Sequence, residues 1–401
     1  MKKIKLITYA NFPYGGASAN FLRYFSLSLI NEGHDVEVIL PKGNIYGANV
    51  ENPNQRKGSV GNVKYKHLCF TNQPKAIFGK IVSNLCSILF PFFYLLKEHF
   101  TSTYDIIILF NPSFSKVISL LLIKKIFNKR FIIIIPEFFE KPNKQGLLTS
   151  IVWYDFFLGM KFLVKYADAF IVVSTYLKKY IQDDLKVIKP IMVLPNLMDP
   201  DIFELKDIKP FIEGVTTIGY TGTPTRKDGA TDLIESFAVL HKKYPQTHLL
   251  IVGDVSGGKS VIPELKKQAE ELQIINNITF TGLVPFTKIP ELLNSCQILA
   301  LTRPSGVFAE AGFPTKLGEY FACKKPVLMT RVGDISTYFN NEEHLVIVNP
   351  DDIVDIANGF KKIIDNPQLS STMVENAYNW MKENLNYRTV NRNIAAFIEN
   401  M

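Results

Sequence analysis

A short stretch near position 315 combines residue types that suit a ligand carrying both negative charge and hydroxyl groups. GFPTKLGE, residues 312–319, sets Pro314, Thr315 and Lys316 at the start of an apolar, helix-like segment. Proline fits the first turn of a helix without losing a hydrogen bond, and free backbone N–H groups there attract anions. One turn later, the Glu319 carboxylate can accept hydrogen bonds from two adjacent hydroxyl groups. The pattern predicts a phosphate-and-sugar site; the simpler alternative is a helix cap with a surface lysine–tyrosine pair.

Two glycine-rich turns carry further polar groups. In GYTGTPTRKDG, residues 219–229, Arg226 and Lys227 stand between a strand-like run and the next helix. Two cations there can neutralise a diphosphate, although a solvated surface pair is the alternative. In FPYGGASAN, Gly15 and Gly16 precede the first helix, where their N–H groups can approach a ligand or close a plain tight turn. This turn lacks the GxGxxG pattern of dinucleotide sites.

The elements that must position these residues form two similar sets. Near-continuous apolar runs, typical of parallel strands covered on both faces, alternate with helix-like segments. In the first half the runs are residues 4–9, 35–40, 105–110, 131–135 and 169–173. In the second half they are residues 216–222, 248–254, 278–282, 298–302, 326–330 and 345–349. The fold class is therefore α/β, with two doubly wound units whose glycine-rich turns fall at the carboxyl ends of strands, where such sheets bind ligands.

Composition and charge narrow the range of partners. The 401 residues are 47% apolar and 20% charged, enough for two domains with full cores. Four scattered cysteines and six unpaired histidines indicate neither a disulfide framework nor a metal site. Residues 1–200 hold 25 lysines and arginines against 13 acidic residues, whereas residues 201–401 hold 20 against 24. The basic half suits anionic lipid or a phosphate-bearing acceptor; nucleic acid is the weakest candidate, because no nucleic-acid-binding motif appears.

One long apolar segment, residues 77–100, has two interpretations. We expect a helix packed on the sheet of the first domain, because polar residues and a proline interrupt the run and argue against a membrane span. The alternative is a face that touches the bilayer, with Lys75, Lys80 and Lys97 on lipid headgroups. The N-terminal run is too short for a signal peptide and predicts a first core strand.

Together these motifs resemble the retaining glycosyltransferases of the GT-B fold, close to glycosyltransferase family 4, the glycosyl transferases group 1. The likeness rests on GFPTKLGEYFACKKPVL, on GYTGTPTRKDG followed by DLIESFAVLHKKYPQTHLLIVGD, on ITFTGLVPFTKIPELLNSCQILAL, and on ADAFIVVSTYLKKYI with VLPNLMDPDIF. It covers nearly the whole chain. It implies a Rossmann-like acceptor-binding domain at 1–200, a Rossmann-like donor-binding domain at 201–380, and a C-terminal helix at 381–401 that crosses back to the first domain.

The resemblance also implies a donor site and its residues. Glu319 would hold the ribose, Gly312 and Phe313 would offer backbone N–H groups to the sugar, and Leu283 and Val284 would flank the base. The remaining expected donor-binding residues are Gly15, Gly16, Gly222, Pro314, Thr315 and Lys316.

Three departures from the family pattern define the expected catalytic residues. The usual first glutamate falls at Ala311, so the adjacent Glu310 is the candidate replacement. Thr223 and Asp228 replace the usual arginine and lysine, which leaves Lys227 as the phosphate lysine with Arg226 in support.

Glu137 stands where many relatives have a histidine. It would assist proton transfer or bind an acceptor hydroxyl, unless it is only a carboxylate at a helix start.

The activity implied by the resemblance is transfer of a sugar from a nucleotide diphosphate sugar to an acceptor hydroxyl, with retention and without metal or cofactor. The expected acceptor is a lipid-linked saccharide or polysaccharide in bacterial surface glycan assembly, such as capsule or lipopolysaccharide. The expected location is the cytoplasm, at the inner face of the membrane. Two alternatives stay open: a nucleotide-sugar epimerase, and a non-catalytic partner subunit that keeps nucleotide-sugar binding, for which Ala311 argues.

Overall fold

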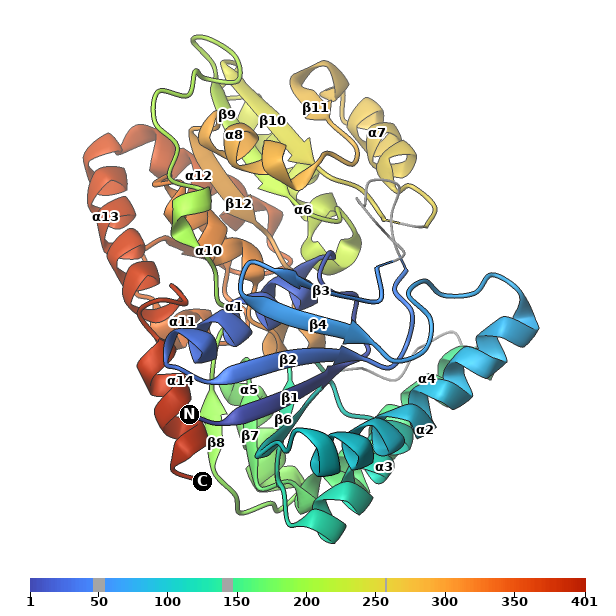
Figure 1. Cartoon of the computed structure of the whole chain (residues 1–401). Helices are drawn as coiled ribbons and strands as arrows, with labels where there is room; N and C mark the ends of the chain where they lie inside the picture. Colours follow the sequence, from blue (N-terminus) through green and yellow to red (C-terminus); the bar gives the residue numbers. More distant parts are fainter. Residues whose placement is uncertain (46–54, 139–146, 257) are drawn as a thin grey trace. The chain divides into compact units, whose positions relative to one another are not determined.

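The computed structural model describes residues 1–45, 55–138, 147–256 and 258–401. The chain divides into two compact units (Figure 1). Unit 1 comprises Met1–Leu197 and Tyr387–Met401, and unit 2 comprises Met198–Asn386. Each is built on one sheet of mainly parallel strands with helices between them, so the predicted α/β class is confirmed.

Unit 1 contains an eight-stranded sheet in the order β3-β4-β2-β1-β5-β6-β7-β8. Only the β3–β4 pair is antiparallel among the described strands. The strands are β1 (Lys3–Thr8), β2 (Asp35–Leu40), β3 (Lys57–Val60), β4 (Val63–His67), β5 (Ile106–Phe110), β6 (Arg130–Ile135), β7 (Ala169–Val172) and β8 (Ile191–Val193).

Helices cover this sheet, and the last of them comes from the end of the chain. They are α1 (Ala17–Asn31), α2 (Ile77–Thr101), α3 (Phe114–Phe127), α4 (Leu147–Leu158), α5 (Thr175–Lys179) and α14 (Asn391–Glu399), with short turns η1 (Gly159–Leu163), η2 (Val164–Tyr166) and η3 (Tyr180–Asp184). The C-terminal segment packs on α1, where the Tyr387 ring stacks on Tyr24 and the Ser28 hydroxyl donates to the Tyr387 carbonyl. The Arg130 guanidinium donates to the Glu399 carbonyl at 3.1 Å.

Unit 2 contains a fully parallel six-stranded sheet in the order β11-β10-β9-β12-β13-β14. Its strands are β9 (Thr216–Thr221), β10 (Thr247–Val252), β11 (Ile278–Phe280), β12 (Ile298–Leu301), β13 (Val327–Thr330) and β14 (Val346–Val348). The order reverses between β9 and β12, as in dinucleotide-binding sheets. The carboxyl ends of these two strands therefore mark the switch point where such sheets bind ligands.

The helices of unit 2 complete the alternation. They are α6 (Ala230–His241), α7 (Ile262–Glu271), α8 (Ile289–Asn294), α9 (Val307–Ala311), α10 (Thr315–Ala322), α11 (Ile335–Tyr338), α12 (Ile353–Asp365) and α13 (Pro367–Asn384). Short turns lie at η4 (Pro200–Ile202), η5 (Arg226–Asp228), η6 (Ile275–Asn277) and η7 (Phe286–Lys288). Because α13 ends at Asn384 and α14 begins at Asn391, the segment 381–401 holds the end of one helix and all of another.

Segment 77–100 forms a helix that packs on the sheet of unit 1, as expected, but the expected burial of its apolar side chains is wrong. The helix is α2, and the residues that α2 buries are Ser83, Ser87, Pro91 and Leu95, while most of its large apolar side chains are exposed. The reason lies in the sheet beneath, which presents polar groups. There the Tyr9 hydroxyl donates to the Ser87 carbonyl at 2.8 Å, and the Lys5 ammonium pairs with Glu98 at 2.8 Å.

Candidate functional site

The candidate site lies in unit 2, at the carboxyl ends of β9 and β12. The loop after β9 leads through η5 into α6, the loop after β12 leads into α9, and α10 begins a few residues later. Each of these segments directly follows a buried strand or begins a helix. The sheet therefore fixes the position of the backbone that carries the polar side chains.

Asp228 lies at the centre of this site. One carboxylate oxygen is 2.5 Å from the Lys316 ammonium, and the other is 3.4 Å from an Arg303 guanidinium nitrogen. The Tyr220 hydroxyl also donates to Asp228 at 3.2 Å. Burial alone would raise the pKa of Asp228, but the charges of Lys316 and Arg303 hold that pKa below its ordinary value. One buried carboxylate thus pairs with two cations.

Two glycines allow the Lys316 and Asp228 segments to meet. Gly222 has a φ of +132°, and a Cβ there would lie 2.2 Å from the Lys316 side chain. Gly229 has a φ of +77°, and a Cβ there would lie 1.6 Å from the Thr302 carbonyl oxygen. The Thr302 hydroxyl in turn donates to the Gly229 carbonyl at 2.8 Å. Only glycine fits at these two positions.

Lys227 and Arg303 extend the cationic cluster, and both lie near the same aromatic ring, that of Phe308. The Lys227 ammonium lies 3.1 Å from the centroid of the Phe308 ring, and the Arg303 guanidinium carbon lies 5.2 Å from it. Arg303 is only 9% exposed, and its Nε and Nη1 atoms make no hydrogen bond within the described part of the chain. Buried donors without acceptors are costly, so this guanidinium is suited to an anion.

Arg303 is absent from the site that the sequence predicts. Its one sequence signal is its position, because it follows the strand ILAL of β12 by two residues, where the carboxyl ends of parallel strands gather. Its partner Asp228 is remote in the sequence, so local spacing does not reveal the pair.

The predicted helix entrance forms, with one difference. Pro314 precedes α10 as its cap residue, with φ −68° and ψ 120°, instead of lying in the first helical turn. Lys316 lies in that first turn and reaches Asp228, while burial lowers the pKa of Lys316 and the Asp228 carboxylate opposes this shift. Phe313 is buried against Tyr338, which fixes the loop before the helix.

Glu319 lies one turn into α10, as the sequence spacing requires. Burial raises the pKa of Glu319 to about 7, and Lys316 opposes the shift. The neighbouring Tyr320 hydroxyl accepts a hydrogen bond from the Thr221 backbone N–H at 3.0 Å, which ties α10 to the end of β9. Hydrogen bonds from the hydroxyl groups of a ligand would stabilise the charged form of the Glu319 carboxyl group and lower its pKa.

Glu310 and Ala311 occupy the end of α9. Ala311 is fully buried, whereas the Glu310 carboxylate accepts a hydrogen bond from the Gly333 backbone N–H at 3.1 Å. A Cβ at Gly312 would lie 3.2 Å from the Phe308 carbonyl oxygen and 3.6 Å from Arg303 Nη1. The Gly312 backbone therefore faces the unpaired side of the Arg303 guanidinium.

The remaining predicted residues lie outside this cluster. Arg226 is exposed on η5, and its charge acts on Asp232 of α6. Leu283 and Val284 follow β11 at the edge of the sheet, with Leu283 exposed.

Gly15, Gly16 and Glu137 belong to unit 1. The two glycines are exposed between β1 and α1, and Gly16 is the residue that precedes α1. Glu137 is partly buried just after β6. Among the residues that the structure describes, no group of three or more histidine, cysteine, aspartate or glutamate side chains gathers as a metal site.

Known proteins resemble this chain in the family of one domain, in sequence and in fold. Residues 201–380 match the family model described as Glycosyl transferases group 1. An uncharacterized glycosyltransferase of Methanocaldococcus jannaschii is 24% identical over 97% of this chain and 96% of its own. HepE of Anabaena, solved in complex with UDP, has a TM-score of 0.70 at 17% identity, covering 100% of both chains. WaaG, a glycosyltransferase involved in lipopolysaccharide biosynthesis, has a TM-score of 0.67 at 16% identity, covering 98% of this chain and 99% of its own.

These similarities agree with the fold and confirm the resemblance found in the sequence. The family model covers most of unit 2, which holds the cationic cluster, and the solved structures share the two-sheet architecture over the whole chain. Residues 201–380 therefore form a glycosyl transferases group 1 domain, and the whole chain has the GT-B fold of the solved glycosyltransferases.

Proposed function

We propose that the protein transfers a hexosyl group from a nucleotide diphosphate sugar to an acceptor hydroxyl, with retention of configuration. The observation that carries this proposal is the cluster of Lys227, Arg303 and Lys316 at the switch point of unit 2. Arg303 supports it most directly, because a diphosphate supplies the acceptors that its buried nitrogens lack among the described residues. HepE, which shares the fold, was solved with UDP bound.

In the proposed mechanism the enzyme stabilises the negative charge that builds on the departing diphosphate. Lys227, Arg303 and the N-terminal turn of α10 act on that charge, because preorganised cations and backbone dipoles stabilise it without having to rearrange. The bond from the anomeric carbon to the phosphate oxygen breaks as the acceptor oxygen attacks the same face. The departing phosphate oxygen takes the acceptor proton. No metal ion or cofactor takes part, because side chains supply the positive charge.

The other site residues hold the two substrates. Glu319 accepts hydrogen bonds from the ribose hydroxyls, and Asp228 holds Lys316 and Arg303 in place before the donor arrives. The backbone of Gly312 and Phe313 contacts the donor sugar, and Glu310 orients it. The residues proposed to contact the diphosphate are Gly15, Gly16, Gly222, Pro314 and Thr315, with Arg226 as an outer cation. Leu283 and Val284 contact the base. Glu137 contacts the acceptor.

The proposed acceptor is a lipid-linked saccharide or polysaccharide in bacterial surface glycan assembly, handled at the inner face of the membrane. The strongly basic first half of the chain supports an anionic partner on that side. WaaG, which is involved in lipopolysaccharide biosynthesis, provides an example of such a role on this fold.

The test is a panel of UDP-, GDP- and ADP-sugars screened by thermal shift, followed by measurement of slow donor hydrolysis for each sugar that stabilises the protein. One donor should raise the melting temperature and turn over. Arg303→Ala should weaken donor affinity by about tenfold to hundredfold, because a charged hydrogen bond is lost. Arg303→Lys should recover part of the affinity, since it keeps the charge without the planar fork.

The matched control is Lys243→Ala, which removes an exposed cation just after α6, on the amino-terminal side of β10. Its donor affinity should equal that of the wild type. Stabilisation by a nucleotide sugar without hydrolysis or transfer, even with lipid-linked acceptors added, would indicate a non-catalytic subunit that binds nucleotide sugars. Release of an isomerised nucleotide sugar without acceptor would indicate an epimerase. An equal loss of donor affinity in Lys243→Ala and Arg303→Ala would show that Arg303 has no specific role in donor binding.

A further inference from the structure

Unit 1 exposes many large apolar side chains on three neighbouring helices. We call this surface the outer face; it is formed by α2, α3 and α4, which run side by side (Figure 1). Its most exposed large side chains include Phe78, Leu85, Leu89, Phe93, Leu122 and Ile126. On α2 these side chains repeat every three to four residues opposite the buried Ser83–Ser87–Pro91 stripe, so one whole side of the helix is apolar and open.

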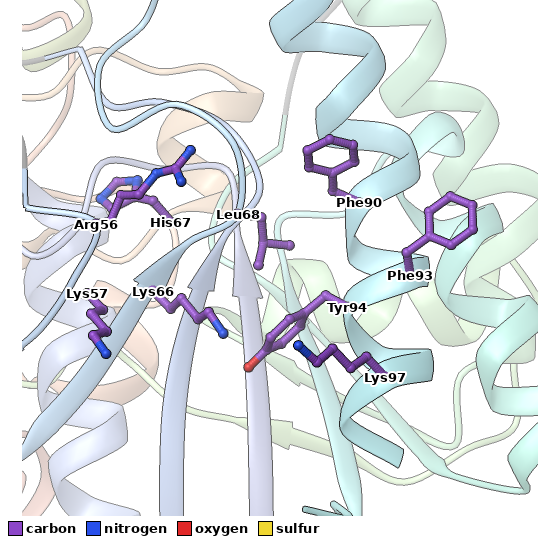
Figure 2. Close-up of a pocket in the computed structure, with 9 residues that line it drawn as sticks. All are labelled: Arg56, Lys57, Lys66, His67, Leu68, Phe90, Phe93, Tyr94 and Lys97. Atoms are coloured by element: carbon purple, nitrogen blue, oxygen red, sulfur yellow. The ribbon is translucent and has the colours of Figure 1, made fainter. Parts of the chain in front are cut away.

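A cationic pocket opens beside this apolar stripe. It has a volume of about 660 Å³ and is lined by Arg56, Lys57, Lys66, His67, Leu68, Phe90, Phe93, Tyr94 and Lys97 (Figure 2). Four of these nine residues are cations and none is a carboxylate. Phe90 and Phe93 line the pocket and are also exposed on the outer face. Positive charge and apolar surface therefore meet along one edge of α2.

Two cations of the pocket, Lys66 and Arg56, are held in place by neighbouring groups. The Lys66 ammonium lies 4.6 Å from the centroid of the Tyr94 ring, and Figure 2 shows it extending toward that ring. The Arg56 guanidinium donates to the Cys69 carbonyl at 2.8 Å. Behind Tyr94, Glu37 and Glu98 share the buried Lys5 ammonium, which leaves one negative charge there, and the charge of Lys66 acts on Glu98. Because the pocket itself holds four cations, the local charge balance is still positive.

His67 borders the pocket at the end of β4, but its ring lies on the face of the sheet opposite the Lys66 side chain, 6.1 Å from the centroid of the Tyr65 ring. It is 3% exposed, and neither ring nitrogen makes a well-formed hydrogen bond within the described residues. Burial lowers the pKa of His67 to about 4, against a smaller opposing effect of the Phe70 backbone, so the ring is neutral at pH 7. The positive charge of the pocket therefore comes from its three lysines and Arg56, and His67 adds none.

We propose that this pocket binds the phosphate headgroup of an anionic phospholipid, and that the outer face rests among the acyl chains beside it. A phospholipid joins a phosphate to apolar chains, which matches a cationic pocket that borders an apolar stripe. The protein then lies on one leaflet. The inference deepens the proposed location at a membrane, and vesicle binding tests it without any sugar donor.

The charges of the outer face favour a lipid surface over a second copy of the chain. In the described residues of α2, α3, α4, η1 and η2, the exposed charged side chains are Lys80, Lys97, Lys125, Lys161 and Lys165. Two such faces brought together would place like charges against each other, whereas anionic headgroups complement them.

Surface attachment also accounts for α2 better than a membrane span. Among the described helices α2 alone is long and apolar enough to cross a bilayer. However, its polar side is bound to the sheet through Ser87 and Glu98. Crossing the bilayer would break these contacts and place a glutamate in hydrocarbon.

The experiment is sedimentation of the full-length protein with vesicles of phosphatidylcholine alone and of phosphatidylcholine mixed with phosphatidylglycerol. The wild type should bind the anionic vesicles more tightly. Lys66→Gln with Lys97→Gln should weaken that binding about tenfold, because each lysine contributes separately to attraction by anionic headgroups. Phe78→Ser with Leu85→Ser should weaken binding to both vesicle types, since both side chains are exposed and their loss leaves the fold intact.

The control is Lys242→Gln with Lys243→Gln, which removes the same charge from exposed positions in unit 2 and should leave binding unchanged. Equal binding by the Lys66/Lys97 variant and this control would overturn the proposal. So would a wild type that ignores vesicles and forms a dimer that Phe78→Ser with Leu85→Ser disrupts. Donor thermal shifts should be the same in the pocket variant and the wild type, which separates this inference from sugar transfer.

Discussion

At the scale of single residues, the candidate site depends on an excess of positive charge around one carboxylate. Asp228 pairs with both Lys316 and Arg303, and Lys227 lies close by against Phe308. Removing Asp228 would leave two buried cations uncompensated, which is costly in an empty site. The carboxylate thus keeps the cations positioned until an anion arrives.

The sequence predicts part of this arrangement. GFPTKLGE correctly places Lys316 and Glu319 on one short helix, because helix entrances have a recognisable local pattern. It does not reveal that Lys316 pairs with Asp228, or that Arg303 joins them, because those contacts link three separate loops. Such pairs are fixed by the strand order of the sheet, which local spacing does not encode.

The raised pKa of Glu319 leads to a pH-dependent stability. Its carboxyl group has a pKa of about 7 in the folded protein against an ordinary value of 4.5, so its stabilising effect is fully present below pH 4.5 and lost as the pH rises through 7. Glu319→Gln should therefore be more stable than the wild type at pH 8, by about 2–3 kcal/mol. The difference should vanish near pH 4.5. Urea unfolding at several pH values measures it.

The affinity for the nucleotide-sugar donor should depend on pH in the wild type but not in Glu319→Gln. Hydroxyl hydrogen bonds favour the charged carboxylate, so donor affinity should rise with pH through 7 in the wild type and stay flat in Glu319→Gln. In the urea experiment without donor, the free energies of unfolding of the wild type and Glu319→Gln could instead differ by the same amount at every pH between 5 and 8. That result would show that Glu319 is not buried in the way described.

At the scale of elements, apolar runs predict most strands of both sheets, while polar or short strands escape. The strands β5, β6, β7, β10 and β12 are almost wholly buried, so their sequences are near-continuously apolar. The antiparallel β3–β4 edge has lysines and a glycine turn, and its alternating burial is too short to stand out. The orientation of α2 is likewise not predictable from its own hydropathy, because it depends on the polar groups of β1 and β2 beneath it.

Gly229 links the loop after β9 to the loop after β12, and its replacement tests that link. Gly229→Ala should destabilise the protein by about 3 kcal/mol or more, because the new Cβ would meet the Thr302 carbonyl oxygen and φ is positive. Gly214→Ala is the control, since Gly214 also has a positive φ, +71°, but open space around it. That control should cost only about 1–2 kcal/mol. Equal losses in urea unfolding would mean that the two loops do not approach as closely as described.

At the scale of the whole molecule, the boundary between the basic and acidic halves of the sequence does not coincide with the division into two compact units. The charge asymmetry follows the sequence, since residues 1–200 are basic and residues 201–401 mildly acidic. The compact units do not, because Tyr387–Met401 belong to unit 1. The sequence shows the two sets of strands clearly, as each carries its own apolar runs. The amphipathic pattern of α14 does not by itself show which sheet the helix covers, because such a helix would suit either one; the expectation that it crosses back to the first domain came from the family resemblance.

This chain path predicts where a defect in α14 is felt. Ile394 of α14 and Ile356 of α12 are both fully buried, and they belong to units 1 and 2 respectively. Ile394→Ala should destabilise unit 1 by about 2–5 kcal/mol through the cavity it leaves, and Ile356→Ala should do the same to unit 2. Hydrogen exchange followed by mass spectrometry should show faster exchange in α1 for the first variant and in α6 for the second, because α14 packs on α1 and α12 packs on α6. Donor affinity should fall only in the second variant. If Ile394→Ala instead loosened α6 and the β9–β12 loops, the last helix would be stabilising unit 2, and the assignment of the C-terminal segment to unit 1 would be wrong.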